Sequence, residues 1–201
     1  TVLPLADSAT SCDLALVGFG EVYAVSLETE KGVIVDNVPM RGCTGTIFTD
    51  IDSTQLATFY RETNTRLIIM QFGGNAIPFN EQPNTIAGTV QSLRKQVRYL
   101  RQCAPEASII FVGPGDMLTL IDGEATTYPL LPYMDRLLRK MAAEEHIAYF
   151  SLYEMMGGKE SMLRWQKNGW AGSDGVHFTR RGAEIAGEKL SEYIITTIRP
   201  R

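Results

Sequence analysis

The sequence predicts an α/β fold in which a mostly parallel sheet lies between helices on both faces. From about residue 32 onward, short apolar runs alternate with segments of helical periodicity, as repeated strand–helix units require. The run at 66–72 is a short continuous apolar run, which is typical of a strand covered on both faces, and 108–114 is a further strand of the same kind of sheet. A chain of 201 residues is long enough for one well-buried domain with a small appendage.

The elements expected after residue 31 alternate in type. Strands are predicted where β-branched and other apolar residues cluster between turn residues, and helices where apolar residues recur every three or four positions. In chain order we expect a strand at 32–40, a helix at 49–64, a strand at 66–72, a helix at 89–103, a strand at 108–114, a helix at 130–146, a strand at 147–153 and a closing helix at 179–198.

Residues 1–31 follow a different pattern. The stretch DLALVGFGEVYAVSLE (13–28) alternates in short bursts around Gly18 and Gly20, which favours a β-hairpin over a helix. We therefore expect two parts, a β-rich segment at 1–31 and the α/β domain at 32–201. The first part is interpreted as the remnant of a β-rich module that precedes or interrupts the domain.

Composition excludes several classes of partner. The net charge is −4, and no cluster of Lys and Arg stands out, so we expect no nucleic-acid partner. No apolar run is long enough to span a membrane. The chain starts at Thr1 without a Met, so the lack of a signal peptide says little about location. Cys12, Cys43 and Cys103 are odd in number and far apart, which argues against a zinc knuckle and a disulfide scaffold.

Candidate ligand-binding loops follow the predicted strands. Ligands gather at the carboxyl ends of the strands in an open parallel sheet. Three loops follow strands there and a fourth stretch precedes the closing helix: RGCTG (41–45), FGGNA (72–76), GPGDM (113–117) and SDGVHF (173–178). Glycines in the three loops that follow strands would let the backbone approach a ligand closely.

The polar residues of these loops allow two interpretations. Asp174 could cap the final helix beside a surface histidine, or it could orient His177 as general base and then general acid. Asn75 could be a turn residue or cap, which its position alone favours, or a donor to an oxyanion. His146 ends a predicted helix and is expected to interact with the carbonyl groups there.

Beyond these residues, the motifs carry a resemblance. DGVHFT (174–179), ahead of an amphipathic C-terminal helix, resembles the last block of the SGNH hydrolases, also called GDSL esterases. FGGNA and RGCTG resemble the blocks that supply the Asn and Gly of that family, in the family's order. MMGGKESMLRWQKNGWAGSDGVHFT (155–179) is similar to a stretch of bacterial peptidoglycan O-acetylesterases and related two-part proteins. In these a β-rich, carbohydrate-binding-like module interrupts the catalytic domain after its first strand. The resemblance covers roughly residues 20 to 195.

The resemblance implies a three-layer α/β/α fold with a flavodoxin-like sheet and a set of site roles. His177 would be the general base and Asp174 would hold its ring, while the Asn75 side chain and the Gly42 backbone N–H would form the oxyanion hole. The implied activity is that of a serine esterase, a carboxylic ester hydrolase that removes acetyl or short acyl groups from a carbohydrate. No metal and no cofactor are implied, and a secreted or periplasmic location is expected.

The nucleophile is the main departure from the family pattern, because the chain contains no Gly-Asp-Ser block. Ala6-Asp7-Ser8 offers a substitute, since Ser8 lies 42 − 8 = 34 residues before Gly42. A nucleophile there would need a helix at 9–31, where the sequence favours a hairpin. We therefore expect the serine upstream of this chain and Ser8 far from His177. A smaller departure is Ala76, where the family often has an acidic residue.

Two other functions remain to be weighed. The chain could be a non-catalytic carbohydrate-binding or scaffold protein on an esterase fold, with Trp165, Trp170 and Tyr153 stacking on sugar rings. The same aromatic residues could instead pack beneath the final loop. A nucleotide-binding flavodoxin-like domain finds little support, because none of the glycine loops matches a dinucleotide-binding or P-loop motif.

Overall fold

The computed structural model describes residues 3–6, 9–22, 25–29 and 31–197, and the chain divides into two units, Thr1–Pro39 and Met40–Arg201. In the second unit, three parallel strands form a sheet in the order β1-β2-β5, with bounds Leu67–Gln71, Ser108–Gly113 and Ala148–Ser151. The predicted strands at 66–72, 108–114 and 147–153 are therefore confirmed.

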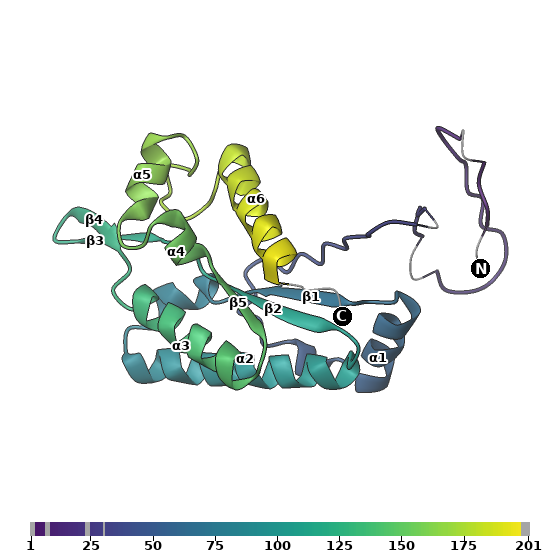
Figure 1. The fold of residues 1–201 in the computed structure, drawn as a ribbon, viewed down its shortest axis with the longest axis horizontal. Helices are drawn as coiled ribbons and strands as arrows, with labels where there is room; N and C mark the ends of the chain where they lie inside the picture. The colour runs from purple at the N-terminus through teal and green to yellow at the C-terminus, as the bar shows by residue number, and fades with distance from the viewer. Residues whose placement is uncertain (1–2, 7–8, 23–24, 30, 198–201) are drawn as a thin grey trace. The chain divides into compact units, whose positions relative to one another are not determined.

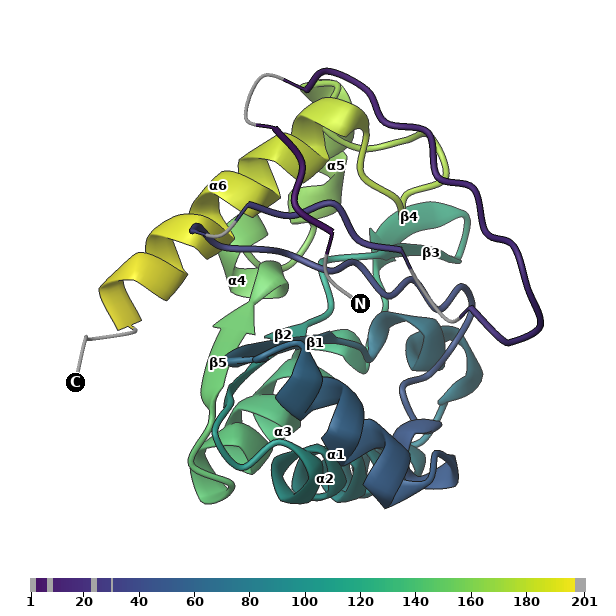
Figure 2. The ribbon, with the colours of Figure 1, turned by 90° about the vertical axis from the view of Figure 1, so that its right-hand side faces the viewer.

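Helices cover both faces of this sheet (Figure 1 and Figure 2). One face carries α1 (Ser53–Glu62), α2 (Pro83–Cys103) and α3 (Leu131–Glu144), and the other carries α4 (Leu152–Met156) and α6 (Arg180–Thr197). The three-layer α/β/α prediction is thus confirmed. Among the described residues, no helix has the length and apolar character needed to cross a membrane.

Strand residues alternate between the two layers because successive side chains of a strand point to opposite faces. Met70, Ile109 and Phe111 belong to the core beneath α2 and α3, and Phe111 is fully buried. Ile110 and Val112 belong to the core on the α6 side. This burial on both faces explains why β2 is continuously apolar.

The N-terminal unit corrects two predictions. No strand forms at 32–40, and no β-hairpin forms over the described residues of 13–28, of which 23 and 24 are not described. The described residues of 1–39 are neither helix nor strand, and large side chains such as Val17 and Phe19 are fully exposed. A hairpin is marginal in water without further strands or a helix against its apolar face, and the described part of this unit provides neither.

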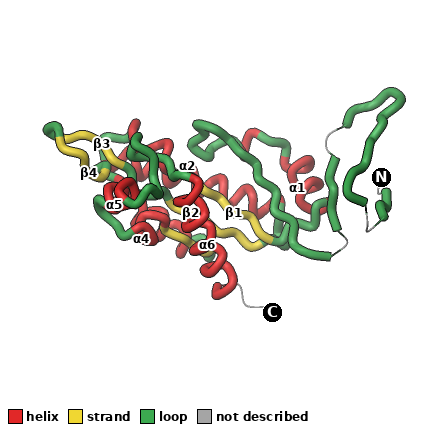
Figure 3. The backbone as a smooth tube through the Cα atoms, turned by 90° about the horizontal axis from the view of Figure 1, so that it is seen from above, coloured by secondary structure: helices red, strands yellow, loops and turns green. Residues whose placement is uncertain are grey.

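Two elements were not expected from the sequence. An antiparallel hairpin of β3 (Leu118–Ile121) and β4 (Glu124–Thr127) follows β2, and the short helix α5 (Ser161–Lys167) follows α4. The hairpin and α1 lie at opposite ends of the second unit (Figure 3). Short 3-10 helices occur at Phe48–Asp50 and Gly74–Phe79.

A buried carboxylate joins the hairpin to α5. Asp116 is fully buried, and its oxygens accept hydrogen bonds from Thr127 Oγ1 at 2.7 Å, Ser161 Oγ at 3.3 Å and the Met162 backbone N–H at 2.9 Å. The Asp116 backbone N–H in turn donates to the sulfur of Met156 at 3.2 Å. Residues of the MMGGKESM stretch therefore hold the loop that follows β2.

Candidate active site

All four predicted loops contribute to one pocket at the carboxyl ends of the strands. Its volume is about 310 Å³. Its lining residues are Cys43, Gln71, Phe72, Gly73, Gly74, Asn75, Pro114, Gly115, Met117, Leu152, Val176, His177 and Phe178. Segments more than 130 residues apart in sequence thus meet here, because parallel strands end at the same edge of a sheet.

Asp174 and His177 form a hydrogen-bonded pair. Asp174 Oδ2 lies 2.8 Å from His177 Nδ1. The other oxygen, Oδ1, accepts from the backbone N–H groups of Val176 at 2.9 Å and His177 at 3.0 Å. One carboxylate therefore shapes the turn and holds the ring.

The turn depends on the glycine between these residues. Gly175 has φ +69°, and a Cβ atom there would lie 3.0 Å from Cβ of Leu118. The Gly175 carbonyl also accepts a hydrogen bond from the Leu118 N–H at 2.9 Å. Glycine thus permits both the conformation and the close approach of β3.

The pKa of Asp174 is lowered from its ordinary value of 3.8 to about 2. The largest cause is the hydrogen bond from the His177 backbone N–H, followed by those from the His177 side chain and the Val176 N–H. These donors stabilise the charged carboxylate, so Asp174 stays ionised near neutral pH.

The pairing sets the chemistry of the imidazole. A carboxylate at Nδ1 favours the tautomer with its proton on Nδ1, which leaves the lone pair on Nε2. The His177 side chain is 82% exposed, so Nε2 is accessible. The ring can therefore accept a proton from a group bound in the pocket.

Asn75 lies beside the pair in the same pocket. Its Nδ2 donates to the Cys43 carbonyl at 3.1 Å, which uses one of two amide protons. The second proton remains for a bound oxygen. Gly73, with φ +114°, accepts the Ala76 N–H at 3.0 Å and makes the turn that carries the amide.

Gly42 is next to a residue of the pocket but is not among the residues that line it. It lies in a turn closed by the hydrogen bond from the Cys43 N–H to the Met40 carbonyl at 3.2 Å, and its φ of +71° favours glycine. The pocket lining among the described residues includes its neighbour Cys43 but not Gly42.

The aromatic candidates take different places. Trp165 is only 4% exposed, and its Nε1–H donates to the Met156 carbonyl at 3.2 Å. Its ring contacts Trp170 at a centroid distance of 5.6 Å and Phe178 at 4.9 Å. Trp165 therefore packs beneath the final loop and has no free face for a sugar. Tyr153 is partly buried against the core on the α3 side.

Two other predicted residues lie outside this pocket or outside the described part. His146 has φ +53° after the last turn of α3, and its backbone N–H donates to the Ala143 carbonyl at 3.2 Å. It precedes β5, so it lies at the amino edge of the sheet, opposite the pocket. Ser8 lies outside the described residues.

Comparison with known protein families finds a match over most of the chain. The sequence profile described as the GDSL-like lipase/acylhydrolase family matches residues 7–185. A search of curated proteins finds no significant match.

Solved structures share the fold. A structure of a peptidoglycan O-acetylesterase superposes with a TM-score of 0.64 at 28% identity over 77% of this chain. The chain spans 45% of the length of that protein. A protein from Lactobacillus plantarum superposes with a TM-score of 0.54 at 16% identity, over 71% of this chain and 74% of its own. The periplasmic domain of a lipopolysaccharide acetyltransferase from Salmonella ser. Paratyphi A superposes with a TM-score of 0.50 at 12% identity. The match covers 69% of this chain and 60% of that domain's chain.

The last two similarities concern the fold alone. The family profile covers most of the chain, including the loops that carry Asn75, Asp174 and His177. The chain belongs to the GDSL-like lipase/acylhydrolase family.

Proposed function

We propose that this chain forms the larger, C-terminal part of a serine esterase that removes acetyl or other short acyl groups from a carbohydrate. The observation that carries the proposal is the Asp174–His177 pair, joined at 2.8 Å beside Asn75 in one pocket. A carboxylate-oriented imidazole next to an amide donor is the arrangement that acyl transfer requires.

In the proposed mechanism, a serine hydroxyl attacks the ester carbonyl and His177 Nε2 takes its proton. The alkoxide of the tetrahedral intermediate accepts hydrogen bonds from Asn75 Nδ2 and the Gly42 N–H. His177 then protonates the leaving sugar oxygen. Water attacks the acyl-enzyme, with the same imidazole as base, and releases the carboxylic acid.

The serine itself is proposed to lie upstream of this chain, with Ser8 as the alternative. The described residues 9–22 and 25–29 form no helix, which supports the upstream position, because a nucleophile turn needs a helix behind it. The division of the chain at residue 31, with the N-terminal segment as the remnant of an interrupting module and a catalytic domain at 32–201, remains part of this proposal.

The carbohydrate substrate and the location are proposed from similarity. The peptidoglycan O-acetylesterase is 28% identical over the matched region, which supports an acetylated glycan as substrate and a secreted or periplasmic location. The proposed reaction uses protein groups only, with no metal or cofactor.

The experiment is turnover of p-nitrophenyl acetate by the longest native form of the protein. His177→Ala should reduce kcat/KM by about a thousand-fold or more, and Asn75→Ala by about a hundred-fold. Arg180→Ala, a highly exposed residue three positions after His177, is the control and should retain activity. Full activity of His177→Ala would contradict the mechanism.

The same assay separates the esterase from a non-catalytic sugar-binding protein. An inactive longest native form that still binds oligosaccharide would support the second function. The burial of Trp165 removes one of the stacking residues on which that alternative depends.

A further inference from the structure

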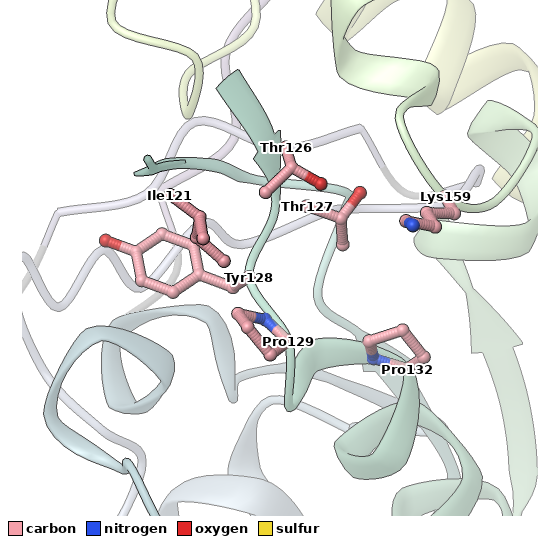
Figure 4. Close-up of a pocket in the computed structure, with 7 residues that line it drawn as sticks. All are labelled: Ile121, Thr126, Thr127, Tyr128, Pro129, Pro132 and Lys159. Carbon is pink, nitrogen blue, oxygen red and sulfur yellow. The ribbon is translucent and has the colours of Figure 1, made fainter. Parts of the chain in front are cut away.

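A second pocket lies beside the β3–β4 hairpin, apart from the residues of the catalytic proposal. Its volume is about 350 Å³, at the lower end of the range of about 300–1,000 Å³ for small-molecule sites. Its lining residues are Ile121, Thr126, Thr127, Tyr128, Pro129, Pro132 and Lys159. Figure 4 shows these side chains around one space, with Tyr128 and Ile121 on one side and Lys159 on the other.

The two sides of the pocket differ in chemistry. Ile121, Pro129, Pro132 and the ring of Tyr128 supply apolar surface. A sugar ring presents its C–H groups to such surface and its hydroxyl groups to polar side chains. The pocket therefore has the apolar surface that contact with the C–H groups of a sugar requires.

The polar side is held in place by Glu160. Its Oε1 accepts from Thr126 Oγ1 at 3.3 Å and lies 3.5 Å from Lys159 Nζ. The Glu160 backbone N–H donates to Thr127 Oγ1 at 2.7 Å. An ammonium group has three protons, so Lys159 can still donate to a hydroxyl or carbonyl oxygen of a ligand.

Charges near the pocket favour a neutral ligand. Among the residues that line the pocket, Lys159 is the one with a charged side chain at neutral pH, and the Glu160 carboxylate lies 3.5 Å from its ammonium group. Because this carboxylate already compensates the ammonium charge, hydroxyl and amide groups suit the pocket better than an anionic group.

The pocket is linked to the candidate active site by the backbone. The Tyr128 N–H donates to the carbonyl of Met117 at 3.0 Å, and Tyr128 lines this pocket while Met117 lines the catalytic one. The next residue, Leu118, donates to the carbonyl of Gly175 between Asp174 and His177. Each pocket thus includes one residue of the hydrogen-bonded pair at the base of the β3–β4 hairpin.

We propose that this second pocket binds a neutral sugar ring that neighbours the acylated sugar in an oligosaccharide. The inference rests on the proposed esterase function and adds the substrate class, namely acylated oligosaccharides in preference to acylated monosaccharides. Lys159 lies within the MMGGKESM stretch, whose other polar contacts hold the Asp116 loop.

The test is binding of two neutral trisaccharides, triacetylchitotriose and cellotriose, measured by calorimetry or ligand-observed NMR on the full chain. Ile121→Trp should fill the pocket, because Ile121 is 42% exposed at its rim. We expect binding of at least one trisaccharide to weaken about tenfold or more in Ile121→Trp, and about fivefold in Lys159→Met. Matched controls are Leu163→Trp, at a residue that is 38% exposed on α5, and Lys167→Met, and both should bind within about twofold of the parent chain.

The binding experiment and the esterase assay can fail independently, so each tests its own proposal. Turnover of p-nitrophenyl acetate by the longest native form should be unchanged in Ile121→Trp, since this ester does not reach the second pocket. Failure of that form to cleave the ester, with trisaccharide binding intact, would reject the esterase and leave the sugar site standing. Failure of both trisaccharides to bind, or equal binding by Ile121→Trp and the parent chain, would overturn the sugar site.

Discussion

Gly45 lies directly against the ring of Phe72. A Cβ atom on Gly45 would be 2.5 Å from Cγ of Phe72, and the residue has φ +88°. The contact holds the loop of Gly42 and Cys43 against the end of β1, where Asn75 follows three residues after Phe72. Backbone conformation and packing therefore both require glycine at this position.

Gly45→Ala should lower the free energy of unfolding by about 2 kcal/mol or more, through strain and overpacking. Gly88→Ala is the matched control. Gly88 lies inside α2, and no atom outside the local helix backbone would lie within 4 Å of a Cβ at this position, so alanine should stabilise the chain by about 0.5–1 kcal/mol. Chemical denaturation measures both, and a similar effect of the two substitutions would refute the argument.

Stability should depend strongly on Asp116, a buried carboxylate outside the Asp174–His177 pair. Asp116→Ala leaves the Thr127 and Ser161 hydroxyls and the Met162 N–H without their acceptor, and each buried unsatisfied group costs about 1–3 kcal/mol. We expect a loss of about 3 kcal/mol or more in urea unfolding. Asp50→Ala, at an exposed residue, should change stability by less than about 0.5 kcal/mol.

Asp174 should give the chain a specific acid sensitivity. Because its pKa is about 2 in the folded state, below the ordinary 3.8, its stabilising contribution is present above 3.8 and is lost as pH falls toward 2. Unfolding free energies measured across this window should decline less in Asp174→Asn than in the parent chain. Parallel declines would show that the hydrogen bonds of Asp174 do not favour its charged form.

The sequence predicted the core strands well because their signal is local. A continuous apolar run such as 108–114 is needed wherever helices cover both faces. Two further local signals lie in the sequence. Pro83 marks the start of α2 six residues before the predicted 89, as proline favours the first helical turn. Asp122-Gly123, with φ values of +53° and +85°, is a hairpin-turn pair that identifies β3 and β4.

Other features depend on tertiary contacts that local patterns do not contain. The expected strand at 32–40 has β-branched residues but no strand partner within the described part of its unit. The role of Asp116 depends on partners at 127, 161 and 162. Asp174 and His177 were identifiable because they lie three residues apart, whereas the position of Asn75 beside them required the parallel sheet.

The last prediction concerns the nucleophile. Ser8→Ala in the longest native form should leave p-nitrophenyl acetate turnover within about twofold of the parent, because the described residues 9–22 form no helix that could support a nucleophile turn. Ser11→Ala is the matched control. A fluorophosphonate, which labels activated serines, should modify a peptide upstream of Thr1 in that form and should not label residues 1–201 alone. Labelling of Ser8, together with a loss of activity of about a thousand-fold in Ser8→Ala, would identify Ser8 as the nucleophile and make residues 1–201 sufficient for catalysis.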